Sequence, residues 1–95
     1  RRPVFVYFTA DWCITCKVNE RVALADSDVI RAVQDGAVAV LKADWTNKDD
    51  RIAKELASFG RNGVPLYLCY PADGSAPKIL SQILTPAMLL AELTD

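Results

Sequence analysis

Two kinds of hydrophobic pattern alternate along this chain, and together they predict its secondary structure. Short runs rich in β-branched and aromatic residues predict strands, because such residues favour an extended backbone. Segments in which apolar residues recur every three or four positions predict helices, because that spacing places them on one helix face. We expect strands over residues 3–9, 37–43, 66–70 and 78–84. We expect helices over about residues 13–25, 27–34, 48–59 and 86–93.

Several residues at the expected helix ends have the chemistry of caps. Ser27 or Asp28 can cap the second helix and Asn47 the third, because their side-chain oxygens accept free backbone N–H groups. Gly60 follows the third helix, where a left-handed residue commonly ends a helix. Thr85, followed by proline, is expected to cap the last helix.

The order of these elements predicts the fold. The first strand is apolar at nearly every position, which is typical of a central strand with helices on both faces. The order β-α-(α)-β-α-β-β-α predicts a parallel crossover between the first two strands and a late antiparallel hairpin. The predicted fold class is α/β: a mixed sheet of about four strands with helices on both faces.

Length and composition narrow the class of protein further. The chain has 95 residues, 52% hydrophobic and 24% charged, as expected of one globular domain over residues 1–95. Its net charge of -1 does not suggest a nucleic-acid or anionic-membrane partner. Because histidine is absent, Ser-His-Asp triads, Cys-His pairs and HExxH metal sites are excluded.

The chain opens inside the first expected strand, with neither an initiator methionine nor a leader sequence. We therefore expect it to be an N-terminally truncated fragment of a longer protein. No stretch approaches the roughly 18–20 apolar residues that span a bilayer. Any targeting or membrane segment would lie upstream of Arg1.

Two of the three cysteines, Cys13 and Cys16, stand where the first strand ends and the first helix begins. The N-terminus of a helix stabilises a thiolate, the reactive form of cysteine, at Cys13. Cys16 follows on the same face, one turn deeper and within range of a disulfide. An exposed thiol and a recessed thiol are what thiol–disulfide exchange needs, so a redox function is the favoured interpretation.

Other interpretations stay open at this point. The pair could be half of a zinc site, although only Cys69 could add a further Cys or His ligand. It could also be a structural disulfide, or hold Cu(I) in a binding module without turnover. Cys69 itself is expected to be a small hydrophobic residue, with Tyr67 as its neighbour on the same face of its strand.

Two residues near the pair also allow more than one interpretation. Trp12 stands directly before the first cysteine, which favours a shield or docking surface over ordinary packing. Glu20 could be a solvated helix carboxylate that pairs with Lys17 or Arg21.

The stretch ADWCITCK (residues 10–17), the later Gly63-Val64-Pro65 and the strand order resemble the thioredoxin superfamily. More narrowly, this stretch, KADWTN (42–47) and FGRNGVP (59–65) together resemble the C-terminal periplasmic domain of DsbD-type thiol:disulfide interchange proteins. The resemblance covers almost the whole chain and implies a thioredoxin-like fold.

The resemblance implies a role for individual residues. Cys13 would be the attacking thiol and Cys16 the resolving thiol. Pro65 matches the cis-proline of the family, and the Val64 backbone would pair with an incoming peptide as an added strand. Glu20 matches an acidic residue of the family and would accept or return the proton of Cys16. No metal or organic cofactor is implied, because the electrons reside in the thiols.

The resemblance also implies a place in electron transfer. The domain would be a protein-disulfide reductase that accepts electrons from a membrane-embedded cysteine pair and passes them to partner domains or periplasmic proteins. It would act as a monomer on the periplasmic side of the bacterial inner membrane, within a membrane-embedded parent. A freestanding thioredoxin-like reductase or isomerase is the alternative within the enzyme class.

Two positions depart from the family pattern. Ile14-Thr15 replaces the Gly-Pro that thioredoxin has between its cysteines, which leaves the reduction potential open. Tyr7 stands six positions before the first cysteine, where the family tends to carry an acidic residue. We therefore expect Glu20 to act alone or with Tyr7 as its hydrogen-bond partner.

Overall fold

The structure, a computed structural model, describes residues 2–93; residues 1, 94 and 95, at the ends of the expected domain, lie outside the described residues. Its centre is a four-stranded sheet in the order β2-β1-β3-β4. β1 (Val4–Thr9) runs parallel to β2 (Ala39–Asp44) and antiparallel to β3 (Leu66–Tyr70). β4 (Lys78–Ile79) extends the sheet antiparallel to β3. The predicted mixed sheet, with its parallel first pair and late hairpin, is confirmed.

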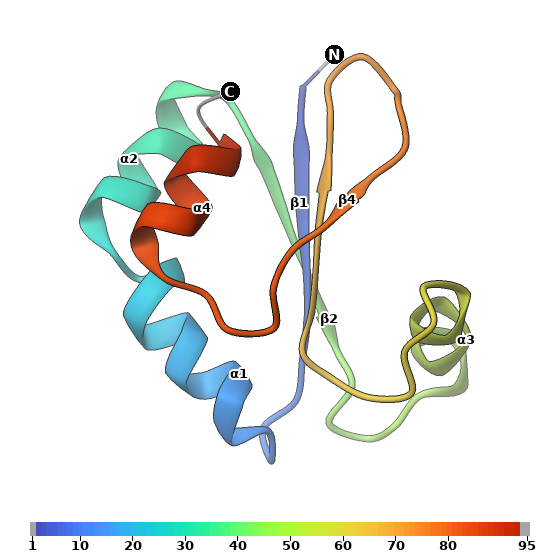
Figure 1. Ribbon diagram of the computed structural model, residues 1–95. Helices are drawn as coiled ribbons and strands as arrows, with labels where there is room; N and C mark the ends of the chain where they lie inside the picture. Colours follow the sequence, from blue (N-terminus) through green and yellow to red (C-terminus); the bar gives the residue numbers. More distant parts are fainter. Residues whose placement is uncertain (1, 94–95) are drawn as a thin grey trace.

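Helices cover both faces of this sheet (Figure 1). α1 (Ile14–Asn19), α2 (Ser27–Asp35) and α4 (Pro86–Leu93) lie on one face, and α3 (Asp50–Ser58) lies on the other. After α1 the chain continues as a short π-helix, η1 (Glu20–Leu24), so the first predicted helix is wider in its second half. Among the described residues, no helix is long and apolar enough to cross a bilayer.

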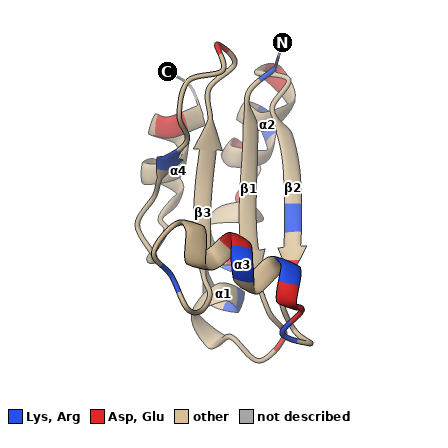
Figure 2. Cartoon of the chain, turned by 90° about the vertical axis from the view of Figure 1, so that its right-hand side faces the viewer, with Lys and Arg blue, Asp and Glu red and all other residues tan. Residues whose placement is uncertain are grey.

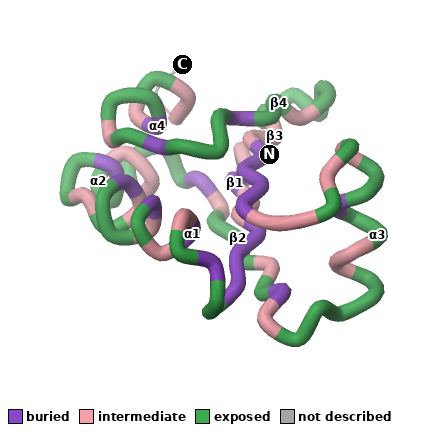
Figure 3. Tube along the Cα trace, turned by 60° about the horizontal axis from the view of Figure 1, so that its bottom comes forward, coloured by how far each residue is buried: buried purple, intermediate pink, exposed green. Residues whose placement is uncertain are grey.

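Side chains of β1 and β3 alternate between two hydrophobic cores, one on each face of the sheet. Phe5 and Tyr67 lie in the core beneath α2 and α4, and their stacked rings have centroids 6.2 Å apart. Phe8 and Leu68 lie in the core beneath α3, together with Leu56 of that helix. Every residue of β1 is buried or of intermediate exposure, and none is exposed (Figure 3). The expectation of a strand buried on both faces is confirmed.

The predicted strand 78–84 is wrong beyond its second residue, and Asn19 supplies the reason. The Asn19 side chain is 2% exposed. Its amide nitrogen donates to the Tyr67 hydroxyl (2.9 Å) and the Gln82 carbonyl (2.8 Å), and its oxygen accepts the Leu84 N–H (3.1 Å). The Leu80 N–H still donates to the Tyr67 carbonyl of β3 at 3.0 Å. Further on, the backbone groups of Gln82 and Leu84 bond the Asn19 side chain, so the segment leaves the sheet on its way to α4.

Two helix caps differ from the sequence prediction. Asp26 caps α2 in place of Ser27 or Asp28, and Asp49 caps α3 in place of Asn47. In both helices the carboxylate of the capping residue accepts the N–H groups two and three residues further on. Each true cap is an aspartate one or two positions from the predicted one. The prediction chose the wrong residue because several neighbouring side chains can also accept backbone N–H groups.

The expected end of α3 and start of α4 are confirmed. Gly60 follows α3 with a left-handed backbone (φ 74°), and Thr85 Oγ1 accepts the Met88 N–H in the first turn of α4. The exposed side of α3 carries charges of both signs (Figure 2), as a solvated helix face does.

Replacing Asn19 by alanine should lower the free energy of unfolding by about 2–4 kcal/mol, because two backbone groups and a tyrosine hydroxyl lose a buried partner. Urea unfolding at pH 7 measures this change. Asn47→Ala is the matched control, because Asn47 is exposed, and it should change that free energy by less than about 0.5 kcal/mol. Equal values for the two variants would show that Asn19 does not secure the segment before α4.

Candidate active site

The two motif cysteines lie between β1 and the first turn of α1, where they form a disulfide. Their Cα atoms are 5.2 Å apart, within the usual range for a bridged pair. Cys13 is the N-cap of α1, and its Sγ accepts the Cys16 backbone N–H at 3.2 Å. When the pair is reduced, this N–H can stabilise a thiolate on Cys13. Cys13 is 7% exposed and Cys16 is 0% exposed, so one sulfur-bearing residue is outer and the other recessed.

The loop before β3 packs beside the disulfide. The Val64–Pro65 peptide bond is cis, as the family resemblance implies. Val64 packs against the small buried cluster formed by Ala10, Cys13 and Cys16. Two segments that are far apart in the sequence therefore meet at the cysteines.

Glu20 lies at the start of η1 with its side chain 24% exposed. Its Oε2 accepts the Thr9 hydroxyl at 2.5 Å, and its Oε1 lies 3.4 Å from Lys17 Nζ, so the predicted ion pair with Lys17 is present. Of the two alternatives for Glu20, acting alone or with Tyr7 as its hydrogen-bond partner, the one with Tyr7 is wrong. Tyr7 stacks on Phe5 with ring centroids 6.2 Å apart. Thr9, two residues further along the same face of β1, is the side chain that reaches the carboxylate.

Thr9 is a residue of the site that the sequence reasoning missed. It is 1% exposed, and its hydroxyl donates to the Glu20 carboxylate. A buried hydroxyl requires a hydrogen-bond partner, so a threonine at the end of a mostly apolar strand is the signal that could have drawn attention to it. The identity of its partner depends on where η1 lies.

Trp12 is held at the surface by the loop that follows β2. Its Nε1 donates to the Thr46 carbonyl at 3.0 Å, and its ring centroid lies 5.9 Å from that of Trp45. Lys48 Nζ lies 5.3 Å from the Trp12 ring centroid, within the range of a cation–π contact. Trp12 remains 49% exposed, and Ile14, which follows the first cysteine, is 80% exposed. Exposed apolar side chains therefore flank the outer cysteine in the sequence.

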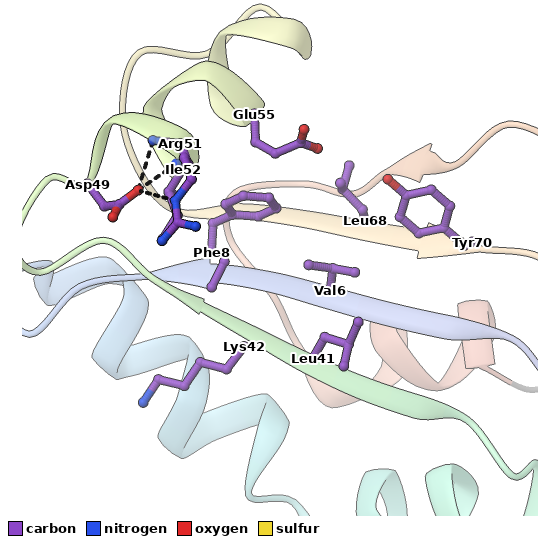
Figure 4. Close-up of a pocket in the computed structure, with 11 residues that line it drawn as sticks. Val6, Phe8, Leu41, Lys42, Asp49, Arg51, Ile52, Glu55, Leu68 and Tyr70 are labelled. Carbon is purple, nitrogen blue, oxygen red and sulfur yellow. Dashed lines mark hydrogen bonds and ion pairs between the residues drawn. The ribbon is translucent and has the colours of Figure 1, made fainter.

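Two features of residues 2–93 bear on alternative sites: the grouping of metal-ligating side chains and a pocket beneath α3. Within residues 2–93, no three or more His, Cys, Asp or Glu side chains are grouped so that they could hold a metal ion. A pocket of about 540 Å³ lies between α3 and the sheet (Figure 4), lined by Val6, Leu68 and Tyr70 of the sheet and by Arg51 and Glu55 of α3. This pocket contains neither of the paired cysteines, so the redox chemistry does not take place there.

Cys69 packs against the core beneath α2 and α4, on the same face of β3 as Tyr67, as predicted. Burial and, to a smaller extent, Glu92 raise the pKa of its thiol to about 11, against a weaker opposite effect of Lys78. The thiol is therefore protonated at neutral pH and is a poor nucleophile. These properties agree with the prediction that Cys69 serves as a small hydrophobic residue.

Comparisons with known proteins agree with this geometry. Residues 1–72 match a family model described as Thioredoxin-like. The thiol:disulfide interchange protein DsbD of Ralstonia nicotianae is 40% identical over 76 residues, which are 78% of this chain and 12% of that protein. The DsbD of Escherichia coli is 30% identical over 73 residues, which are 77% of this chain and 13% of that protein. The chain therefore spans about an eighth of the length of these relatives.

Solved structures give the same result. The C-terminal domain of Neisseria meningitidis DsbD, 26% identical, matches with a TM-score of 0.78 in its oxidised form and 0.79 in its reduced form. These matches cover 95% and 98% of this chain, and 76% and 79% of the DsbD chains. A thioredoxin from Thermus thermophilus, 21% identical, has a TM-score of 0.72 over 98% of this chain and 72% of its own, which shows a shared fold.

Cys69 should react slowly with thiol reagents in the oxidised protein. With a pKa of about 11 in place of 9.0, its labelling by Ellman's reagent at pH 8 should be about a hundredfold slower than after unfolding in urea, because only the thiolate reacts. As long as the pH is below that pKa, the labelling rate should increase about tenfold for each unit by which the pH is raised. Equal rates in the native and unfolded protein would contradict the effect of burial.

Proposed function

The chain belongs to the thioredoxin-like family, and on this premise we propose that it is a DsbD-type thiol:disulfide oxidoreductase domain with the following route of electrons. They pass from a membrane-embedded cysteine pair to the Cys13–Cys16 disulfide, and from the reduced pair to disulfides of partner domains or periplasmic proteins. The main support is the position of the disulfide at the N-cap of α1, with Cys13 outermost.

The proposed cycle begins when the membrane-embedded dithiol reduces the Cys13–Cys16 disulfide. The Cys13 thiolate then attacks one sulfur of a partner disulfide; a new S–S bond forms, and the other partner sulfur leaves as a thiolate that takes up a proton. The Cys16 N–H, 3.2 Å from Cys13 Sγ, supports this step because it favours the thiolate.

In the second step the Cys16 thiol loses its proton and attacks the sulfur of Cys13. The internal disulfide re-forms, and the second partner sulfur is released as a thiol, so two electrons have moved to the partner. We assign Glu20 as the acceptor of the Cys16 proton. The support is that the Glu20 backbone N–H bonds the Cys16 carbonyl one helical turn away, and that Thr9 orients the Glu20 carboxylate. The cycle requires no metal or organic cofactor.

We assign partner docking to Trp12, Val64 and Pro65. Half-exposed Trp12 and exposed Ile14 offer apolar surface next to Cys13, and aromatic side chains are enriched in protein interfaces. The Val64 backbone belongs to the loop beside the cysteines, where an extended peptide could pair with it as an added strand.

We propose that residues 1–95 form one domain of a membrane-embedded parent protein, on the periplasmic side of the bacterial inner membrane. The domain would act there as a monomer. The support is the match to DsbD proteins, of which this chain spans 12–13% of the length.

Replacing Cys16 by serine should trap a covalent adduct between Cys13 and a partner, because the thiol that resolves the mixed disulfide is missing. The reduced variant is mixed with insulin as the disulfide probe, and the adduct is read by non-reducing electrophoresis and mass spectrometry. Cys13→Ser is the matched control and should trap little. Equal trapping by the two variants would reverse the assigned order. Retained Cu(I) without turnover in the unmodified protein would favour a binding module instead.

Glu20→Gln should slow the second step by about a hundredfold at pH 7, because the amide has a similar shape but cannot accept the proton of Cys16. The difference in rate between Glu20→Gln and the unmodified protein should become smaller as the pH rises, since hydroxide then removes the Cys16 proton. Stopped-flow release of thiol from insulin, measured from pH 6 to 9, gives the profile. The control is Glu55→Gln on the exposed side of α3. Identical profiles for the two variants would remove Glu20 from the proton transfer.

A further inference from the structure

The turn that follows β2 has no part in the exchange steps above. It lies against residues 10–13, the reactive loop that joins β1 to α1 and carries Cys13. Asp44 Oδ1 accepts both the backbone N–H of Thr46 at 3.0 Å and the Thr46 hydroxyl at 2.5 Å. The Thr46 hydroxyl oxygen in turn accepts the Asp11 backbone N–H at 2.9 Å, and the Thr46 carbonyl accepts Trp12 Nε1 at 3.0 Å. One residue therefore bonds both positions that precede the outer cysteine.

We propose that Thr46 is a positioning residue for disulfide exchange: through Asp11 and Trp12 it fixes the backbone that carries Cys13 in the orientation for attack. This role rests on the proposed function, since it takes Cys13 as the attacking thiol. Thr46 acts through the loop and not on the sulfur itself. Loss of the restraint is expected to slow the attack step and to leave the later resolution by Cys16 unaffected.

Asp44 directs the hydroxyl of Thr46 toward this task. A hydroxyl has one proton, and donating it to a carboxylate leaves the oxygen lone pairs to accept another N–H. Two hydrogen bonds from Thr46 lower the pKa of Asp44, and the bond from the hydroxyl has a larger effect than the bond from the backbone N–H. The carboxylate therefore stays ionised at neutral pH. The result is a chain of hydrogen bonds from carboxylate to hydroxyl to amide that ends at the reactive loop.

The sheet brings this turn to the reactive loop and holds it there. Thr9 and Asp44 are register partners at the ends of β1 and β2, and the Trp45 N–H donates to the Thr9 carbonyl at 2.7 Å. Trp45 is 9% exposed and contacts the ring of Trp12. Because the turn is anchored to two strands, it can restrain the loop and does not simply move with it.

A second turn of the same chemistry provides a matched control. Ser75 donates its backbone N–H to Asp73 Oδ1 at 2.9 Å, and its hydroxyl donates to the same oxygen. That turn lies in the connection between β3 and β4, at the opposite end of the sheet from the start of α1 (Figure 1). Removing the Ser75 hydroxyl therefore breaks a hydroxyl–carboxylate hydrogen bond of the same kind as that between Thr46 and Asp44. It leaves the hydrogen bond between Thr46 and Asp11 intact.

Thr46→Val keeps the shape of the side chain and removes its hydroxyl. In a Cys16→Ser background, which isolates the attack step, this variant should form the Cys13–insulin mixed disulfide about tenfold more slowly. Thr46→Ser should restore the rate, and Ser75→Ala should leave it unchanged. Hydrogen exchange of the Asp11 amide should be about tenfold faster in Thr46→Val than in the other two variants.

The possible failures are distinguishable. If Asp11 exchange accelerates in Thr46→Val but the attack rate equals that of Ser75→Ala, the positioning role is wrong and the proposed function stands. Unchanged Asp11 exchange overturns the positioning role as well, because the restraint is then absent. If Cys16→Ser alone forms no adduct, the proposed function itself fails. Should Thr46→Val not fold, Asp44→Asn weakens the same chain of bonds; an attack rate equal to that of the parent would overturn the proposal.

Discussion

The hydrogen bond from the Cys16 backbone to the Cys13 sulfur depends on where one strand ends and one helix begins. β1 ends at Thr9, and α1 begins at Ile14, so that Cys13 becomes the cap of the helix. The same turn places the second cysteine behind the first, within bridging distance. A shift of the helix start by one residue would rotate these side chains by about 100°, and the sulfur would lose both its N–H donor and its partner.

Three loops meet at this edge of the sheet for a topological reason. β1 and β2 are parallel, so both end there, and β3 is antiparallel to β1, so it begins there. The register pairs Thr9 with Asp44 and Phe8 with Leu66, which brings the turn after β2 and the cis-proline loop to the cysteines. The first loop supplies the reactive sulfur, the second a set of hydrogen bonds, and the third a packing surface.

Buried polar groups fix α1 and the adjoining helical turn in place. Within residues 2–93, every buried side-chain nitrogen or oxygen atom has a hydrogen-bond partner. Asn19, at the end of α1, bonds β3 and the segment that leads to α4, and Thr9 bonds the carboxylate of Glu20. Because an unpaired buried polar group is costly, these bonds select one position of the helix relative to the sheet. The cysteines at the other end of that helix are positioned by the same constraint.

The sequence by itself determined the local features: the first three strands, the burial of β1 on both faces, and the cysteine pair at the start of a helix. These depend on residues that are close together in the chain, where periodicity and capping chemistry are informative. The place of Val64 beside the cysteines followed only from the resemblance to a family. Tertiary structure alone decided that Glu20 pairs with Thr9 and not Tyr7, that Thr46 bonds the reactive loop, and that β4 is short. Each of these features joins side chains and backbone groups 11 to 65 positions apart, and a local pattern does not specify which groups meet over such separations.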